Sequence, residues 1–307
     1  MRIAVVGSNM VDLTAYITRM PAPGETLEAP DFALGCGGKG ANQAVAAALC
    51  GADVMMVSRV GTDIFADNTI RNFKTFGVDT THVKKVEGMS SGVAPIFVDR
   101  HGQNSILIIK GANNALTPAE VDAAEADIRS CGLIILQLEI PLETVYHTIE
   151  LGRHSGIPVL LNPAPATKDL AIDRVCACDF FVPNETELAI LTEMPTATQE
   201  DVEHAATFLL EKGLKNIIVT LGERGAFWMT KAEKHYVPAC HVDATDTSGA
   251  GDAFIGCFSS SYVHGDPLAA IRKASAFAAL SVTRKGTQMS YPDRATFAAF
   301  LAQQGGR

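Results

Sequence analysis

Residues 246–252 read Asp-Thr-Ser-Gly-Ala-Gly-Asp and lead straight into the apolar run Ala253-Phe254-Ile255-Gly256-Cys257-Phe258. This pattern predicts a glycine-rich turn that opens a helix. The backbone N–H groups of residues 249–251 would lie at the positive end of the helix dipole, where they can bind a phosphate. Asp252 would lie beside that anion, where a carboxylate repels phosphate but can accept a proton from an attacking hydroxyl. The motif therefore indicates phosphoryl transfer to an alcohol.

A purely structural interpretation of this motif also exists. The glycines can form a tight turn and Asp252 can stabilise the helix dipole, since acidic residues are common in first turns. Two better-known nucleotide-binding motifs do not fit. A dinucleotide-binding fingerprint requires glycine where this chain has Phe254, and the lysine of a P-loop is missing. A bound nucleotide would therefore be held by another arrangement.

A second glycine cluster occupies residues 35–43, which read Gly-Cys-Gly-Gly-Lys-Gly-Ala-Asn-Gln and precede an apolar run. It again predicts a turn that leads into a helix. It is not a P-loop, because Gly40 stands where Ser or Thr would bind magnesium. Its small residues permit close approach of the backbone to a compact polar ligand, to which Lys39 and Asn42 can donate hydrogen bonds. A structural turn with an exposed lysine is the alternative.

Asp12, Glu139 and Asn184 each follow a short apolar segment that predicts a buried strand. The carboxyl ends of strands are the places where open α/β sheets bind their ligands. We therefore expect these three side chains to lie along one rim of a sheet. An ordinary loop position is the alternative for Asp12.

Short aliphatic runs alternate with helical patterns along most of the chain, which predicts a doubly wound α/β fold with a mostly parallel sheet and helices on both faces. Strands are expected near residues 2–7, 54–60, 132–138, 157–162, 179–183 and 216–221. Helices are expected near residues 40–50, 63–76, 118–129, 142–155 and 199–213. Two stretches, about 11–35 and 88–110, contain alternating apolar residues without a helix and predict an extra small sheet. Residues 303–307 are expected to form an unstructured tail.

The two glycine motifs, GGKGANQ and DTSGAGD, resemble those of the ribokinase-like (pfkB) carbohydrate kinases. Shorter segments follow in the order of that family, namely Gly7-Ser8-Asn9-Met10-Val11-Asp12, Gln137-Leu138-Glu139, Asn162-Pro163-Ala164-Pro165, Asn184-Glu185-Thr186-Glu187, Thr220-Leu221-Gly222 and Thr283-Arg284-Lys285-Gly286. The resemblance covers essentially the whole chain and implies a single ribokinase-like α/β kinase domain over residues 1–307. It also implies that the small sheet is a lid over the sugar and that two lids pack together in a homodimer. The expected co-substrate is ATP, with Mg²⁺ and with K⁺ as activator.

The resemblance also implies roles for individual residues. Asp252 would be the catalytic base beside the sugar, and the amides of Gly249, Ala250 and Gly251 would bind the transferred phosphoryl group. Sugar contacts would come from Met10, Asp12, Gly38, Lys39, Asn42 and Glu139. The nucleotide side would comprise Asn184, Thr220, Gly222, Glu223, Gly225, Gly251 and Ser275, with Glu187 acting indirectly on Mg²⁺. A monovalent cation would be bound, largely through main-chain carbonyls, by Asp246, Ser248, Ser281, Arg284, Gly286 and Ser290.

Within the family the pattern is nearest to the kinases of ribose and 2-deoxyribose, and it departs from the ribose kinases at Met10. Those enzymes usually carry asparagine two residues before the aspartate that Asp12 matches, and its amide can bind a sugar hydroxyl. Methionine would leave the 2-hydroxyl of ribose unpaired at a cost of about 1–3 kcal/mol. We therefore expect phosphorylation of the 5-hydroxyl of 2-deoxy-D-ribose, with D-ribose as a slower substrate, since apolar pockets reject an added hydroxyl by only about a hundredfold. The alternative is that Met10 merely repacks the lid.

Composition narrows the possible partners. The net charge of −9 argues against nucleic acid or an anionic membrane. No apolar stretch approaches the length of a membrane span, and Met1-Arg2-Ile3 leads into a predicted strand rather than a signal peptide. The seven cysteines are scattered and are interpreted as reduced thiols, so we expect a cytoplasmic protein. Cys176 and Cys178 have no histidine or second cysteine pair nearby, so no transition-metal site is expected.

Two rival functions stay open at this point. Another sugar or nucleoside kinase of the same fold would keep Asp252 and its phosphate-binding turn but use different lid contacts. A nucleoside kinase needs aromatic stacking for the base, whereas the single tryptophan, Trp228, falls in a predicted nucleotide-side strand far from the lid. That position favours a bare sugar as substrate. A non-catalytic sugar or nucleotide sensor on the same fold is the rival of a different class.

Overall fold

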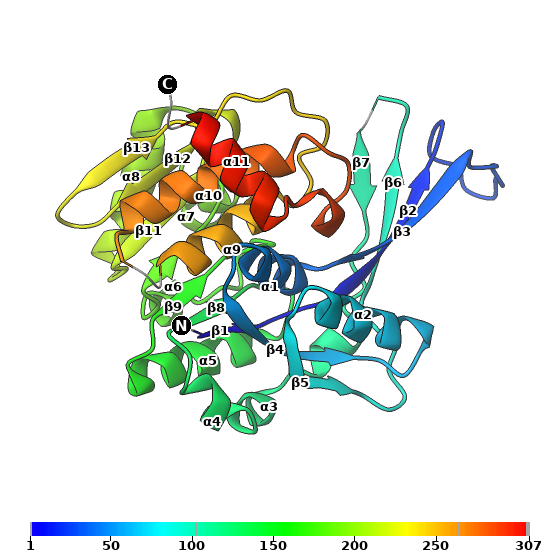
Figure 1. Cartoon of the computed structure of the whole chain (residues 1–307), viewed down its shortest axis with the longest axis horizontal. Helices are drawn as coiled ribbons and strands as arrows, with labels where there is room; N and C mark the ends of the chain where they lie inside the picture. Colours follow the sequence, from blue (N-terminus) through cyan, green and yellow to red (C-terminus); the bar gives the residue numbers. More distant parts are fainter. Residues whose placement is uncertain (1, 102, 263–264, 305–307) are drawn as a thin grey trace.

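A computed structural model describes residues 2–101, 103–262 and 265–304 of the chain. Within these residues, the strands of a large central sheet are β1 (Arg2–Val6), β4 (Asp53–Val60), β5 (Asp79–Lys85), β8 (Leu133–Leu136), β9 (Val159–Leu161), β10 (Phe180–Phe181), β11 (Asn216–Thr220), β12 (Ala226–Met229) and β13 (Lys234–Val237). Their order across the sheet is β13-β12-β11-β10-β9-β8-β1-β4-β5 (Figure 1). In this order, all neighbouring strands between β11 and β5 pair in parallel. Strands β12 and β13 add an antiparallel edge next to β11. The predicted α/β class with a mostly parallel sheet is confirmed.

Helices cover both faces of this sheet (Figure 1). One face is covered by α3 (Pro118–Asp122), α4 (Glu125–Ile128), α5 (Leu142–Ser155), α6 (Ile172–Val175), α7 (Glu185–Thr192) and α8 (Gln199–Glu211). The other is covered by α1 (Lys39–Leu49), α2 (Ile64–Thr75), α9 (Ala250–Tyr262), α10 (Pro267–Ser281) and α11 (Arg294–Gln304). Within β1, Ala4 and Val6 belong to the first core and Ile3 and Val5 to the second, because successive strand side chains point to opposite faces. Burial of apolar surface on both faces is the main force that stabilises the fold.

Helices α1 and α9 pack closely against each other. A Cβ atom on Gly256 would lie 2.4 Å from the Cβ of Ala46 and 2.7 Å from the backbone nitrogen of Ala47, so only glycine fits at this crossing. The N-termini of the two helices carry the two glycine motifs. Gly38 is the N-cap of α1, and Gly249 immediately precedes α9. The crossing therefore holds the two motifs at a fixed separation.

A smaller sheet projects from one side of the main body (Figure 1). Its strands, in the order β3-β2-β6-β7, are β2 (Met10–Tyr16), β3 (Asp31–Gly37), β6 (Val93–Val98) and β7 (Asn104–Ile106). Asp12 pairs with Gly35 on β3, and its neighbour Leu13 pairs with Leu34. Because side chains alternate along a strand, Asp12 and Leu13 point to opposite faces of this sheet. The small sheet expected from the two alternating stretches is confirmed.

Several elements differ from the sequence-based expectations. The helix expected over 118–129 is divided into α3 and α4 by a turn at residues 123–124, which buries Ala124 against the same core as both helices. The strand expected over 179–183 is reduced to two residues. Helices α7, α10 and α11 were not expected, and alanine-rich α10 and α11 carry little apolar periodicity. Helix α11 includes the first two residues of the expected tail, and residues 305–307 lie outside the described residues.

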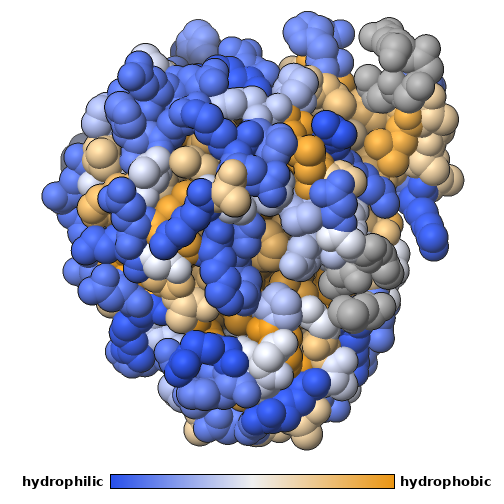
Figure 2. All heavy atoms as spheres, turned by 90° about the vertical axis from the view of Figure 1, so that its left-hand side faces the viewer, coloured by the Kyte–Doolittle hydropathy of each residue, from blue (hydrophilic) through white to orange (hydrophobic). Residues whose placement is uncertain are grey.

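The molecular face at the β13 end of the large sheet is covered mainly by hydrophilic residues (Figure 2). Within the described residues, no helix combines the length and the apolar character needed to cross a membrane.

Candidate active site

A cleft of about 160 Å³ lies at the carboxyl ends of the central parallel strands. This is the position at which open α/β sheets bind ligands. The residues that line it come from the end of β11, from the segments after β9 and β10, from the turn before α9, and from the first turns of α1, α7 and α9: Lys39, Asn162, Val182, Asn184, Glu187, Thr220, Thr247, Gly249, Ala250, Gly251, Asp252 and Ile255. The cleft thus brings together eight of the predicted site residues, namely Lys39, Asn184, Glu187, Thr220, Gly249, Ala250, Gly251 and Asp252.

The turn before α9 has the conformation that the sequence motif predicts. Gly249 has φ of +73°, and a Cβ atom there would lie 2.3 Å from Cγ2 of Thr287 and 2.9 Å from the hydroxyl oxygen of Tyr291. A glycine is therefore required at this position. At Gly251, in contrast, a Cβ atom would meet no atom of the described residues within 4 Å. Packing does not explain the glycine there, whereas a phosphate lying against the backbone would.

Asp252 lies in the first turn of α9 and is only 7% exposed. Its Oδ2 accepts a hydrogen bond from Nδ2 of Asn42, and its Oδ1 accepts one from Nε2 of Gln43, both at 2.9 Å. A carboxylate oxygen has two lone pairs, so each oxygen keeps one for a substrate hydroxyl. Asn42, which was expected to contact the sugar, is placed by its amide against this carboxylate.

The sugar-side motif packs on the first residues of β2. Gly38 has φ of +89°, and a Cβ atom there would lie 2.7 Å from the backbone nitrogen of Met10. A Cβ atom on Gly37 would lie 2.3 Å from Oδ2 of Asp12. Met10 is buried and lies two residues before Asp12 on the same strand, so both side chains are on one face of the small sheet. The motif is therefore built around these two side chains.

Three carboxyl groups gather on this side of the cleft. Burial raises the pKa of Asp12 to about 7, and the charges of Glu139 and Asp252 act in the same direction. Glu139 is buried, and its Oε2 accepts hydrogen bonds from the hydroxyl of Ser8 at 2.6 Å and from the backbone N–H of Lys39 at 2.9 Å. Such a group of acceptors suits a ligand that is rich in hydroxyl donors.

The ammonium group of Lys39 balances these carboxylates. Burial alone would lower its pKa, but the charges of Asp252, Glu139 and Glu187 raise it and prevail. Lys39 therefore stays protonated within the cleft. A fixed cation in this position can bind a phosphoryl oxygen while it neutralises the surrounding acids.

Asn184 and Glu187 form a capping box at the N-terminus of α7. The backbone N–H of Asn184 donates to Oε2 of Glu187, and the backbone N–H of Glu187 donates to Oδ1 of Asn184, both at 2.8 Å. This structural role explains the spacing of the two residues. Burial raises the pKa of Glu187, although the Asn184 amide and Lys39 oppose it. Because both residues also line the cleft, the cap holds a carboxyl group at the wall of the cleft.

The remaining residues expected on the nucleotide side are less closely grouped. Thr220 lines the cleft, and the loop that follows it contains Gly222 and the exposed Glu223. Gly225 has φ of +99°, and a Cβ atom there would lie 2.0 Å from the carbonyl oxygen of Val237, so its glycine has a structural cause. Ser275 lies in α10 and is not among the residues that line the cleft, and its buried hydroxyl has no hydrogen-bond partner within the described chain.

The segments expected to bind a monovalent cation lie side by side. The carboxylate of Asp246 accepts hydrogen bonds from the backbone N–H groups of Ser248 and Gly286, each at 2.9 Å. These bonds outweigh the effect of burial and lower the pKa of Asp246. The hydroxyls of Ser281 and Ser290 donate to carbonyls three residues earlier in the chain, and Arg284 is exposed. Main-chain carbonyl oxygens are therefore the ligands that these segments can provide for a cation.

Sequence reasoning missed several residues of the site, above all Gln43, Gln137, Gln288 and Tyr291. Gln43 stands inside the second glycine motif and is fully buried on α1. A glutamine in a helix of otherwise small and apolar residues indicates a buried hydrogen-bond partner, because buried polar groups are almost always hydrogen-bonded. The other three residues gave no local signal, because their partners lie far away in the sequence.

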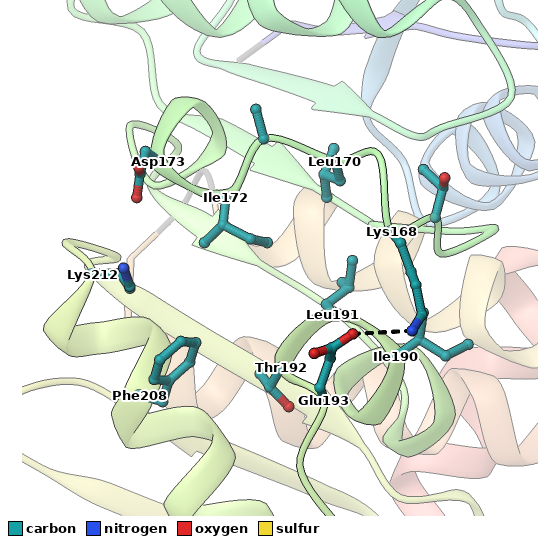
Figure 3. Close-up of a pocket in the computed structure, with 12 residues that line it drawn as sticks. Lys168, Leu170, Ile172, Asp173, Ile190, Leu191, Thr192, Glu193, Phe208 and Lys212 are labelled. Atoms are coloured by element: carbon teal, nitrogen blue, oxygen red, sulfur yellow. Dashed lines mark hydrogen bonds and ion pairs between the residues drawn. The ribbon is translucent and has the colours of Figure 1, made fainter.

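A larger cavity of about 390 Å³ lies elsewhere, between α6, α7, α8 and the segment after β9 (Figure 3). Its walls include Leu170, Ile172 and Phe208, and an ion pair joins Lys168 to Glu193 at its edge. No predicted site residue lines it. We therefore assign the chemistry to the smaller cleft, which contains the titratable groups and the glycine turn.

Comparison with known proteins agrees with this geometry. The model of the pfkB family of carbohydrate kinases matches residues 1–294. A deoxyribokinase of Salmonella typhi is 61% identical over 303 residues, covering 98% of this chain and 99% of the relative, and a ribokinase of Schizosaccharomyces pombe is 44% identical over 94% of each chain. The solved structure of Arabidopsis thaliana ribokinase complexed with ribose and ATP superposes with a TM-score of 0.92 at 32% identity, covering 97% of this chain and 98% of that one.

The chain therefore belongs to the pfkB family of carbohydrate kinases, and its activity is ATP-dependent phosphoryl transfer to a carbohydrate. The family resemblance and the enzyme class inferred from the sequence are confirmed.

Proposed function

We propose that this kinase transfers the γ-phosphoryl group of ATP to the 5-hydroxyl of 2-deoxy-D-ribose and accepts D-ribose as a slower substrate. The observation that carries the proposal is the burial of Met10 on the same face of the small sheet as Asp12. A thioether there offers no hydrogen bond to a 2-hydroxyl, whereas a CH₂ group needs none. The high identity to a deoxyribokinase supports the same substrate.

The residues in the cleft and beside it have different roles in the reaction. Asp12 and Glu139 orient the sugar by accepting hydrogen bonds from its hydroxyls. Asp252 accepts the proton of the 5-hydroxyl as that oxygen attacks the γ-phosphorus, and the bond to the β-phosphate oxygen breaks as ADP leaves. The N-terminus of α9 and Lys39 neutralise the charge that develops on the transferred group. Catalysis of this kind consists mainly of positioning and charge stabilisation.

The donor groups present also fit the two cations that the family resemblance implies. Glu187 carries a carboxylate at the edge of the cleft, and hard oxygen ligands of this kind suit Mg²⁺, directly or through water. The segments around Asp246 and Gly286 offer backbone carbonyls that suit K⁺. When bound, Mg²⁺ would neutralise charge on the phosphates, and K⁺ would steady the turn before α9.

We propose further that two chains pair through the outer face of the small sheet. The face opposite Asp12 is apolar and open: Phe32, Leu34, Leu107 and Ile109 are 60%, 53%, 61% and 43% exposed. Strand register places these residues on the side of Leu13. Exposed apolar patches of this kind mark interaction sites, and a second copy is the partner that the family resemblance favours. The seven free cysteines support action in a reducing compartment, the cytoplasm.

The substrate proposal is tested by kcat/KM for 2-deoxy-D-ribose and D-ribose, measured side by side with ATP, Mg²⁺ and K⁺. We expect a preference for 2-deoxy-D-ribose of about five- to a hundredfold, reduced by Met10→Asn. Equal or greater activity on ribose would instead make Met10 a packing residue without influence on sugar choice.

A further inference from the structure

The two oxygens of Asp252 are held by the amides of consecutive residues of α1. Nε2 of Gln43 donates to Oδ1 and Nδ2 of Asn42 donates to Oδ2, each at 2.9 Å. The same Nε2 of Gln43 lies 3.2 Å from Oδ1 of Asn162. The carboxylate is thus bound from the neighbouring helix rather than from its own.

Each of these amides is itself held at its carbonyl end. Nε2 of Gln137 donates to Oε1 of Gln43 at 2.7 Å, and Nε2 of Gln288 donates to Oδ1 of Asn42 at 2.9 Å. Nδ2 of Asn72 in turn donates to Oε1 of Gln288 at 2.7 Å. An amide has donors at one end and an acceptor at the other, so a reversed Gln43 would face Asp252 with an oxygen and Gln137 with a second NH₂ group. Gln288, whose own carbonyl accepts from Asn72, therefore fixes the direction in which Asn42 donates, and the NH₂ group of Gln137 favours the direction seen for Gln43.

Burial makes this arrangement effective. Gln43 and Gln137 are 0% exposed and Gln288 is 3% exposed, so water cannot replace a lost partner. Hydrogen bonds are strong in such surroundings, and unmade ones are costly. Because Gln43 has no exposed surface, it acts on the reaction through Asp252 and not by touching the sugar.

These hydrogen bonds affect the orientation of the Asp252 carboxylate and the groups that it can accept. An amide NH₂ group can donate but has no acceptor to offer, so one amide at each oxygen of Asp252 matches a carboxylate that accepts at both. One bond to each oxygen also fixes the rotation of the carboxylate plane. Asp252 lines the cleft, so a lone pair on each of its oxygens is left for a ligand there.

We infer that Gln43, oriented by Gln137, is the positioning residue of the catalytic base Asp252. This inference rests on the proposed role of Asp252 in phosphoryl transfer. Gln43 sets the ionised carboxylate in the direction of the incoming hydroxyl, and Gln137 prevents its amide from turning over. Neither residue contributes to sugar binding.

The first test is Gln43→Met, which keeps approximate length and removes both polar ends. We expect kcat to fall about ten- to a hundredfold, because a small displacement of a reacting group carries a cost of this size, while KM for the sugar changes less than about threefold. Gln137→Met should also lower kcat, by a smaller factor, and should leave KM unchanged. The control is Ser259→Ala on α9, whose buried hydroxyl lacks a partner in the described chain and whose loss should leave kcat unchanged.

A second variant, Gln43→Glu, gives a pH signature that a merely structural role would not. The introduced carboxyl faces Asp252 on α9 and the amides of Gln137 and Asn162 after β8 and β9. Burial and the Asp252 charge raise its pKa, so at low pH its neutral OH can donate to Asp252, and at higher pH two carboxylates repel. The ratio of variant to wild-type kcat should therefore rise as the pH falls. A ratio independent of pH would count against the inference.

Combination with Asp252→Asn separates the inference from the proposed function. In that background, Gln43→Met should change the residual rate less than about twofold, because the positioned base is already absent. Near wild-type activity of Asp252→Asn alone would refute the base itself. An inactive Asp252→Asn together with an unimpaired, folded Gln43→Met would refute only the positioning role, and equal losses from Gln43→Met in both backgrounds would assign Gln43 to structure instead.

Discussion

The hydroxyl of Tyr291 donates a hydrogen bond to the carbonyl oxygen of Gly249 across 3.1 Å, which ties the segment after α10 to the turn that opens α9. The same carbonyl accepts the backbone N–H of Ala253 at 2.8 Å. Tyr291 is 5% exposed, and burial raises the pKa of its hydroxyl well above the ordinary value. The group thus stays a neutral donor, and it steadies the turn that is expected to bind the phosphoryl group.

Tyr291→Phe should therefore lower kcat by up to about tenfold, the equivalent of one ordinary hydrogen bond, with little change in KM for the sugar. Tyr236→Phe is the matched control, since that hydroxyl donates to the carbonyl of Gln199 at 3.2 Å, outside the cleft. The measurement is steady-state kcat and KM of both variants compared with wild type. Equal effects of the two substitutions would show that the turn does not depend on Tyr291.

The pKa of Asp12 predicts a pH dependence of sugar capture. Since it is raised to about 7, Asp12 in the free enzyme gains a proton below neutral pH and loses acceptor capacity for sugar hydroxyls. We expect kcat/KM for the sugar to fall below about pH 7, the value that governs the free enzyme. Asp12→Asn should lower kcat/KM and abolish this limb of the profile. Retention of the limb in the variant would assign it to another group.

The raised pKa of Asp12 also predicts that the stability of the fold changes with pH in the opposite direction to sugar capture. Between the ordinary value of 3.8 and about 7, the native state keeps a proton on Asp12 that the unfolded chain releases. Native stability from this group is therefore full below pH 3.8 and is lost as the pH rises through 7. Asp12→Asn should consequently raise Tm relative to wild type at pH 8 but not at pH 4. Thermal unfolding at both pH values tests the sign.

Gly38 is the glycine whose replacement should damage the sugar side most directly. Gly38→Ala has to accommodate both φ of +89° and a Cβ atom 2.7 Å from the backbone of Met10. Gly88→Ala is the matched control, with φ of +74° and no atom of the described chain within 4 Å of the new Cβ. Both variants should lose about 1–2 kcal/mol from backbone strain. Only Gly38→Ala should lose more stability than that and raise KM for the sugar.

The apolar outer face of the small sheet predicts a change of oligomeric state. Leu34→Glu places a charge at a side chain that is 53% exposed on this face. We expect a dimer to become a monomer, as measured by analytical ultracentrifugation, because burial of an unpaired charge at an interface is costly. Ile190→Glu, on α7 beside the larger cavity (Figure 3), should leave the state unchanged. A wild-type chain that sediments as a monomer at micromolar concentration would exclude the proposed pairing.

The parts of this molecule that follow from local chemistry were predictable. The turn at 246–252 combines a glycine that needs positive φ with the start of a helix, and both are properties of adjacent residues. Glu139 and Asn184 follow β8 and β10, and the parallel sheet brings them to one rim as expected. For Asp12 the expectation was wrong, because Asp12 lies within β2 of the small sheet, close enough to Glu139 for the charge of Glu139 to raise its pKa. For Asn184 and Glu187 the sequence suggested metal chemistry, and the structure adds a capping box that explains their spacing without it.

The amides around Asp252 were not predictable in this way. Gln43 and Asp252 are separated by 209 positions, and Asn42 and Gln288 by 246. Nothing within a few residues of Gln43 indicates which helix will pack against α1. Such contacts are decided by the tertiary arrangement, which a short-range pattern of apolar residues does not encode.

The glycine at the crossing of α1 and α9 has a consequence for the reaction itself. Gly256 lines neither motif, yet it lets α9 approach Ala46 and Ala47 more closely than any side chain would allow. A methyl group at this position would spread the two helices and, with them, the two glycine motifs at their N-termini, which are proposed to bind the sugar and the phosphoryl group. Displacements of about 1 Å between reacting groups are enough to change a rate a hundredfold. If the two motifs bind sugar and phosphate as proposed, the distance between the reacting groups depends on the one residue without a side chain at this helix crossing.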